Sequence, residues 1–356
     1  MVVTQYIKGA MLVCIIALSA GIQAQEATEA TDSAEAPPPD VIMLKNGSKI
    51  VGTISSARDG LVVVETDFAG TLSIDAETVE SIESQGSLVV QLADGTIIRD
   101  QPMTVADSQF LIITETGEER AYPATDIALV NPEPWELGDG YKAFGLINFA
   151  WALERGNTVT DELDYKLEAY WRSLEDRYTI LFNGEVDEAN GLKSADNSRI
   201  EGKYDYFLGD NNYWGGRIAA ETDEFQDLDL RALIGPYYGR QFYEEPILTL
   251  AGDLGLSYVT EDFITAEDQE YTGANWEARF SSNYLGGDSN LYINHTGLWN
   301  LKDTDDIILN TTFGLAFPLL GNLQAAAEIL LEYDSGAVEG IEELDETYRL
   351  SIGYTW

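Results

Sequence analysis

The sequence predicts an all-β protein: an antiparallel transmembrane β-barrel of about 12 strands, preceded by a small repeated β domain of the SH3-like or Sm-like kind. Three observations support this fold class. Apolar and polar side chains alternate through much of the carboxyl-terminal part, a near-repeat of 48 residues occurs in the first third, and the N-terminus has the pattern of an export signal. Together they predict a secreted protein with two β domains.

The N-terminus has the parts of a secretory signal peptide. Lys8 supplies a positive charge ahead of residues 10–20, an apolar run too short to span a bilayer as a helix. We expect residues 1–24 to be the signal peptide, and residues 25–40, rich in Ala, Thr, Glu and Pro, to be a disordered linker. The only cysteine, Cys14, lies in the signal, so the exported chain is expected to lack disulfides, thiol catalysis and Cys-ligated zinc.

The composition limits the partners of the chain. Lys and Arg number 20 against 62 Asp and Glu, giving a formal net charge of -42. Such a surface repels phosphate backbones, so nucleic acid is not expected as a partner. The sequence also predicts no cofactor. Aromatic residues make up 11% of the chain, which argues against overall disorder.

Residues 41–131 are predicted to form the repeated β domain, with residues 132–140 as a linker. The turn sequence Leu-Lys-Asn-Gly at 44–47 recurs as Leu-Ala-Asp-Gly at 92–95, and Asn-Gly or Asp-Gly between β-forming residues is the strongest short hairpin signal. The repeat predicts two small, strongly bent sheets. Residues 40–131 contain 15 acidic residues and only 5 basic ones, so RNA binding of the Sm type is not expected. Docking of a periplasmic partner remains an alternative role.

Residues 141–356 are predicted to form the barrel. From Leu163 to Trp171 the odd positions are apolar, whereas the even positions include Asp164, Lys166 and Glu168. A period of two is that of a strand between two different media. Twelve such segments are predicted, an even number as bacterial outer-membrane barrels require. The segments are 141–154, 161–172, 176–187, 198–208, 213–222, 228–241, 246–260, 270–285, 289–301, 306–317, 322–333 and 344–356.

The connections are expected to differ at the two ends of this barrel. Those after even-numbered segments are short, whereas most of the others are longer and acidic; residues 334–346 hold six acids and no base. Short turns are typical of the periplasmic side. The sequence therefore predicts a barrel in the cell outer membrane, in contact with lipid and lipopolysaccharide, and a periplasmic N-terminal domain.

The last segment has the pattern of an assembly signal. Apolar and aromatic residues alternate along it and end on a C-terminal aromatic, which looks like the signal read by the barrel-assembly machinery. That machinery is therefore a predicted partner. The residues of the signal are Tyr348, Leu350, Ile352, Tyr354 and Trp356.

Three motifs resemble a known family. Gly-Asn-Thr at 156–158, Tyr-Asp-Tyr-Phe-Leu at 204–208 and Gly-Tyr-Thr-Trp at 353–356 are similar to the YdiY-like salt-induced outer membrane proteins, domain-of-unknown-function family 481. The resemblance covers roughly residues 141–356. It implies an outer-membrane β-barrel with no established activity and no site residues to carry over. The turn at 44–48 resembles small β modules that precede such barrels.

His295 is the only histidine and the only candidate for catalysis. Ser281 and Ser282 lie on the preceding segment, so a Ser–His pair of the kind used by barrel enzymes that act on lipids is an alternative. A polar His facing the lumen or the rim is the simpler interpretation. We therefore predict a non-enzymatic protein with no catalytic residue, and keep the lipid-modifying hydrolase as the alternative.

Charged residues of the barrel suggest how it would work. Acids in the loops are weak candidates for diffuse divalent-cation binding, although no spacing matches an EF-hand: Glu261, Asp262, Asp268, Glu342, Glu343 and Asp345. A second set is predicted to face the lumen: Asp164, Lys166, Glu168, Glu201, Lys203, Asp205 and Arg231. These charges would either set ion selectivity or form a closed, salt-bridged plug.

The predicted function is a narrow cation-favouring pore or a structural envelope protein relevant to salt stress. Aromatic residues near the strand ends are expected to form girdles at the two membrane interfaces, with a carbohydrate-binding platform as the alternative. They are Trp151, Trp171, Tyr178, Tyr213, Trp214, Tyr284 and Trp299.

Overall fold

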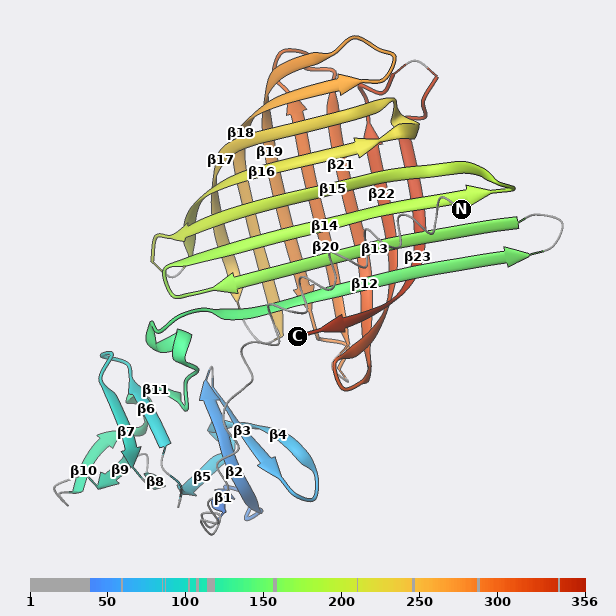
Figure 1. The fold of residues 1–356 in the computed structure, drawn as a ribbon. Helices are drawn as coiled ribbons and strands as arrows, with labels where there is room; N and C mark the ends of the chain where they lie inside the picture. Colours follow the sequence, from blue (N-terminus) through green and yellow to red (C-terminus); the bar gives the residue numbers. More distant parts are fainter. Residues whose placement is uncertain are drawn as a thin grey trace, which may run out of the picture. The chain divides into compact units, whose positions relative to one another are not determined.

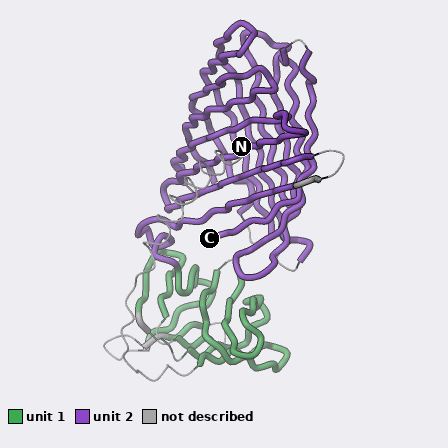
Figure 2. Tube along the Cα trace, turned by 45° about the vertical axis from the view of Figure 1, so that its right-hand side comes forward, with its two compact units in different colours: residues 1–132 green, residues 133–356 purple. Residues whose placement is uncertain are grey.

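The computed structural model describes residues 39–356, apart from 59, 85, 87, 102, 107–108, 114–118, 156–158, 210, 245–246, 287–288 and 339. The predicted signal peptide and most of the predicted linker lie outside the described residues. The chain divides into two units, residues 1–132 and 133–356, and each is described by itself (Figure 2). Within the described residues, no helix combines the length and apolar character needed to cross a membrane.

The described part of the first unit is a single sheet of eleven strands (Figure 1). The order is β10-β9-β8-β5-β1-β2-β11-β6-β7, and β3 and β4 extend from β2. The expectation of two separate sheets is therefore wrong, because strands of the two repeats pair with each other. The elements are β1 Asp40–Leu44, β2 Lys49–Arg58, β3 Leu61–Thr66, β4 Gly70–Asp75, η1 Ala76–Thr78, β5 Val79–Glu83, β6 Leu88–Leu92, β7 Ile97–Gln101, β8 Met103–Ala106, β9 Gln109–Ile113, β10 Glu119–Pro123, η2 Ala124–Asp126 and β11 Ile127–Val130.

Elements of the first unit recur at an offset of 48 residues. The strand β1 corresponds in this way to β6, and the 3-10 turn η1 to η2. The turns after β1 and β6 also match: the amides of Ser48 and Thr96 donate to Asn46 and Asp94 at 2.9 Å. The Thr96 amide holds the pKa of the exposed Asp94 carboxyl below its usual value. The same local sequence thus builds the same turn twice.

The two repeats exchange strand pairing. At one junction β5 pairs with β8 through Ile82 and Val105, and at the other β11 pairs with β2 through Val130 and Ala57. These two junctions are related by the same offset of 48 residues. Ile82 and Val130 are 7% and 2% exposed and belong to one common hydrophobic core. Each repeat therefore completes the sheet of the other.

The second unit is a closed antiparallel barrel of twelve strands, which confirms the predicted fold class and strand number (Figure 1). Each strand pairs with its sequence neighbours, and β23 pairs with β12. The strands are β12 Lys142–Arg155, β13 Val159–Arg172, β14 Asp176–Ala189, β15 Leu192–Phe207, β16 Asn212–Asp223, β17 Leu228–Glu244, β18 Leu248–Phe263, β19 Gln269–Ser282, β20 Asn290–Asn300, β21 Ile307–Leu320, β22 Leu323–Asp334 and β23 Leu344–Thr355. Two 3-10 turns, η3 Pro134–Leu137 and η4 Glu224–Gln226, complete the unit.

Because the strand number is even, β12 begins and β23 ends at the same end of the barrel, which we call the terminal end. The opposite end is the loop end. Its connections run from two residues at 190–191 to nine at 335–343, against two at 321–322 to seven at 283–289 at the terminal end. The connections at the two ends therefore differ less in length than the sequence predicts. The reason is that residues expected to form loops at the loop end belong to paired strands.

The hairpin between β14 and β15 shows this extension. Residues 188–197 are expected from the sequence to be a loop, but only Asn190 and Gly191 lie outside the two strands. Both have positive φ, 53° and 80°, as a type I′ turn requires. An Asn-Gly pair therefore continues the sheet where polar composition suggested a loop.

The two faces of the barrel wall differ in chemistry. On β18, Leu254, Leu256 and Tyr258 point outward and are 63%, 53% and 50% exposed, whereas Asp253 and Ser257 on the same strand are 6% and 1% exposed. Side chains alternate across a strand, so one face forms an apolar exterior and the other a polar interior. The five residues of the last strand singled out from the sequence are all at least 40% exposed on the outer face.

The closing seam between β12 and β23 is short. Four residue pairs join these strands, from Leu146 with Thr355 to Phe149 with Ile352, whereas fourteen pairs join β12 to β13. Trp356 extends the seam through a backbone hydrogen bond to Gly145 at 3.2 Å. Its ring covers Gly145 so closely that a Cβ there would lie 2.3 Å away. The last residue thus packs over the first strand where the barrel closes.

Candidate functional site: the barrel lumen

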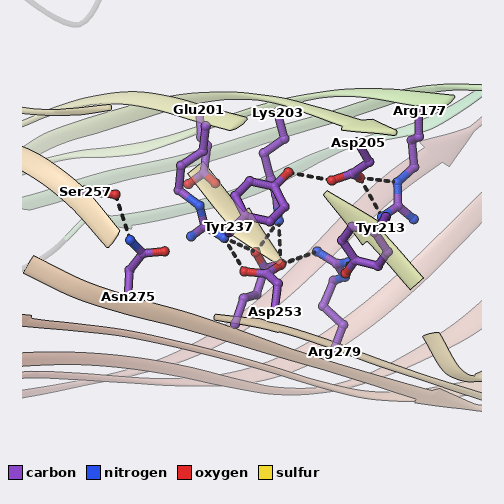
Figure 3. A network of polar contacts seen from close by, with 12 residues as sticks. Arg177, Glu201, Lys203, Asp205, Tyr213, Tyr237, Asp253, Ser257, Asn275 and Arg279 are labelled. Atoms are coloured by element: carbon purple, nitrogen blue, oxygen red, sulfur yellow. Dashed lines mark hydrogen bonds and ion pairs between the residues drawn. The ribbon is translucent and has the colours of Figure 1, made fainter. Parts of the chain in front are cut away.

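Buried ion pairs cross the middle of the lumen. Lys203 on β15 donates to Glu277 on β19 at 2.6 Å and to Asp253 on β18 at 3.1 Å. These strands are not neighbours in the wall, so their side chains meet inside the barrel. Figure 3 shows the contact between the two opposite walls. Arg217 on β16 also pairs with Asp253, so that two cations from one wall share carboxylates from the other.

The same group of charges continues toward the terminal end. Arg279 pairs with Glu277 at 2.5 Å, and Asp205 accepts from Arg177 at 2.8 Å and from the Tyr237 hydroxyl at 2.5 Å (Figure 3). The Tyr237 ring also stacks against cations, with the Lys203 ammonium 4.8 Å from its centroid. Carboxylate, cation and aromatic ring together form one network, which we call the floor. Its residues are Arg177, Lys203, Asp205, Tyr213, Arg217, Tyr237, Asp253, Glu277 and Arg279.

The floor is dry. The side chains of Lys203 and Asp253 are 1% and 0% exposed, and Tyr213 and Tyr237 are among the most deeply buried residues of the chain. The centre of the floor is therefore shielded from water, whereas the Arg177 and Arg279 side chains at its edge are 17% and 27% exposed. Charges can be buried in this way only because each is paired and hydrogen-bonded.

A second group of charges lies on the other side of the lumen. Lys166 pairs with Glu168 at 2.8 Å and with Glu328 at 3.8 Å, and Arg349 on β23 pairs with Asp164 on β13. The Lys166 and Glu168 side chains are 22% and 20% exposed. This group is therefore more accessible to water than the floor.

A third group lies nearer the loop end. Arg199 binds Glu201 at 2.8 Å and Glu221 at 2.6 Å, and Arg231 binds Glu261 at 2.6 Å. Every residue predicted to face the lumen thus has an ion-pair partner in one of the three groups.

Above the third group the lumen opens into a vestibule at the loop end. It encloses about 980 Å³ of empty space, part of it open to solvent. Nine acidic side chains line it, against the two arginines Arg199 and Arg231. Such a lining gives the mouth of the lumen a strongly negative potential.

The candidates for cation binding do not converge on one point. Glu261, Glu342, Glu343 and Asp345 all line the vestibule, but Glu261 is held by Arg231 and by the Tyr271 hydroxyl. Asp268 accepts from the Phe263 amide at 3.1 Å. Within the part of the chain that the structure describes, no group of three or more acids, His or Cys is arranged to hold a metal ion.

His295 occupies neither of its expected places. Ala278 is its cross-strand partner and neighbours the inward-facing Glu277, so His295 lies on the outer face in the middle of β20. Its Nε2 accepts from the Trp276 indole at 3.1 Å, and its Nδ1 lies 2.9 Å from the Thr311 hydroxyl. Ser281 and Ser282 instead face Tyr292 and Leu291 across the strand pair. The imidazole is thus occupied by partners other than serine.

One of the expected girdle residues is also misplaced. Tyr213 is 0% exposed and points inward, where its hydroxyl accepts from Arg279 at 3.3 Å. Trp151, Tyr178 and Trp214, in contrast, are 73%, 44% and 54% exposed. Tyr213 and Trp214 are adjacent on one strand. Because successive side chains of a strand point to opposite faces, only one of the two can lie on the outside.

The sequence did not identify several residues of the floor. Arg217, Asp253, Glu277 and Arg279 have the parity of inward-facing positions, which could have revealed their face. Their pairing across the lumen could not be inferred, because it depends on which strands oppose each other after the barrel closes.

The barrel is similar to the NanC porin structure, at 11% identity over 60% of this chain and 99% of that one, with a TM-score of 0.39. It is also similar to the translocator domain of autotransporter NalP from Neisseria meningitidis, at 12% identity over 61% and 88%, with a TM-score of 0.35. No curated protein matches the chain. Residues 147–356 match the model of one family, so the chain belongs to the family described as protein of unknown function, DUF481.

Proposed function

We propose that this protein is a non-enzymatic outer-membrane β-barrel that admits small cations and passes them at low conductance. In this proposal the terminal end of the barrel and the first unit lie in the periplasm. Lipid and lipopolysaccharide surround the wall, and the barrel-assembly machinery reads the last strand.

The exterior of the wall supports a place in a membrane. The strands are 11 to 17 residues long, and about 9–11 are needed to cross a bilayer at a tilt. Their outward side chains are mostly apolar or aromatic, which in water would form an extended surface prone to aggregation. Most of the strands are longer than a bilayer requires. The additional residues at the loop end include many acids, which would lie outside the apolar part of the wall.

The single observation that carries the cation preference is the acidic vestibule above a dry, ion-paired floor. The lining of nine acids and two arginines concentrates cations and repels anions at the mouth. The floor then limits the flow, because Lys203 and Asp253 pair across the lumen with side chains that are 1% and 0% exposed. A small, cation-selective conductance is the expected result.

The dry floor also favours a second candidate, a closed barrel with a structural role in the envelope. A lipid hydrolase is less favoured, because the His295 imidazole bonds to Trp276 and Thr311 instead of a serine.

Planar-bilayer recording of the purified full chain separates these functions. In a salt gradient, a cation-selective pore gives a reversal potential shifted toward the equilibrium potential of the cation. Glu332 and Glu342 line the vestibule, and replacing both by Gln should reduce this potential. Absence of any conductance, with the barrel correctly folded, would reject the pore and leave the structural role. An anion-selective conductance would reject the proposal itself.

A further inference from the structure

A second cavity lies below the vestibule. It contains about 450 Å³ of empty space, part of it open to solvent, and is lined by Arg199, Arg217 and Arg231 on one wall, with Asn275 and Asn310 on the other. Arg199 and Arg231 also line the vestibule. The two spaces are therefore adjacent, and we call the lower one the base cavity.

The sign of the lining charge reverses between the two spaces. Acids outnumber arginines by nine to two around the vestibule, whereas three arginines and the single carboxylate of Glu221 line the base cavity. The carboxylates that hold Arg217, those of Asp253 and Glu277, lie below it in the floor. A solute in the lumen thus meets carboxylates above and guanidinium groups below.

Arg217 has a hydrogen-bond donor that nothing in the described chain uses. The residue is 6% exposed, and its Nε is buried without a partner among the described residues. Its Nη2 is bound to Asp253. Beside the same cavity, Oδ1 of Asn275 also lacks a partner, although its Nδ2 donates to Ser257 at 2.7 Å (Figure 3). An unpaired buried donor costs free energy, so an acceptor beside the Arg217 guanidinium would stabilise it. The Nε of Arg349 is also buried without a partner among the described residues, but Arg349 does not line the base cavity.

From these observations we propose that the lumen binds a small zwitterion, with its carboxylate on Arg217 in the base cavity and its ammonium group among the acids of the vestibule. This deepens the proposed function, because it names the class of solute that enters the barrel. Arg217 and Glu221 lie four positions apart on β16, about 13 Å along the strand. Leu233, Leu298 and Ile308 line the same base cavity. A flexible apolar chain between the two charges fits this path.

Three probes of one chain length test the proposal: 6-aminohexanoate, hexylamine and hexanoate. Their binding to the purified full chain in detergent micelles is measured by calorimetry at low salt. We expect 6-aminohexanoate to bind about tenfold more tightly than hexylamine, since it adds a charge-assisted hydrogen bond to Arg217. Hexanoate should bind most weakly, because the vestibule repels it.

Matched variants locate the two charges of the ligand. Arg217→Gln should bring the affinity for 6-aminohexanoate down to that for hexylamine, and should leave hexylamine binding within about twofold. Glu332→Gln should weaken both, because Glu332 is an exposed acid of the vestibule. Arg349→Gln is the control, because Arg349 is a lumen arginine held by Asp164 and Glu328 that lies away from the base cavity. It should change neither affinity.

The outcomes are decisive whether or not the barrel conducts. Equal binding of 6-aminohexanoate and hexylamine, or equal effects of Arg217→Gln and Arg349→Gln, would overturn the zwitterion site. Binding of none of the three probes would also overturn it. Selective binding by a barrel without conductance would support the site while rejecting the pore.

Discussion

Replacing Lys203 with Met tests whether the floor stabilises the barrel. The ammonium group makes two charged hydrogen bonds, to Glu277 at 2.6 Å and to Asp253 at 3.1 Å, with its side chain 1% exposed. Each such bond contributes about 1.5–3 kcal/mol. Arg217 and Arg279 still hold the two carboxylates after the substitution. We therefore expect a loss of about 3 kcal/mol, the low end of the range for breaking a buried pair.

The assay is reversible urea unfolding of the barrel in lipid vesicles, followed by tryptophan fluorescence. Lys142→Met is the control, because the Lys142–Glu133 pair is 41% and 45% exposed and such a pair contributes at most about 1 kcal/mol. Adding Glu277→Gln to Lys203→Met removes one charge of each sign, so the double variant should lose less than the sum of the two single changes. Additive losses, with Lys203→Met no worse than Lys142→Met, would show that the floor is hydrated and refute the reasoning.

Two further predictions concern the exchanged sheet and the seam. Residues 39–131 alone should show a cooperative thermal transition by circular dichroism. Residues 39–84 should not, because β5 and β2 would lose their partners in the second repeat. A fragment 39–84 that folds cooperatively as a monomer would contradict this prediction. Gly145→Val should destabilise the barrel by about 1–3 kcal/mol, because the added Cβ would collide with the Glu168 carbonyl oxygen and with the Trp356 ring; the loss would be seen as less folded species on gel electrophoresis. Gly216→Val has open space and should be neutral.

Much of the barrel could be predicted because its signal is local. The alternation of apolar and polar residues is visible in the sequence wherever one face of a strand is apolar. The predicted segment 322–333, for example, differs by one residue from the strand β22 at 323–334. The hairpin at 190–191 was missed because the acids and Asn around it resemble a loop. Its Asn-Gly pair was the available signal, and the polar residues proved to be strand ends beyond the apolar band.

The lumen was less predictable, because its contacts are not local. Parity places Lys203 and Asp205 on one face, but it does not reveal that Lys203 meets Glu277, 74 positions away. That partner depends on closure of the wall. His295 was misjudged for a related reason: a polar residue was expected to face water, whereas bonds to Trp276 and Thr311 satisfy it on the outer surface.

The short seam has a consequence for how the barrel comes apart. Beyond Phe149 on β12 and Ile352 on β23, the two edges have no residue pairs across the seam within the described chain. Backbone groups left without partners are costly in hydrocarbon. A wall joined by fourteen pairs on one side of β12 and four on the other has one weak joint, so unzipping should start there. Heat, pulling force or an entering lipid chain would be expected to part the first and last strands before any other pair.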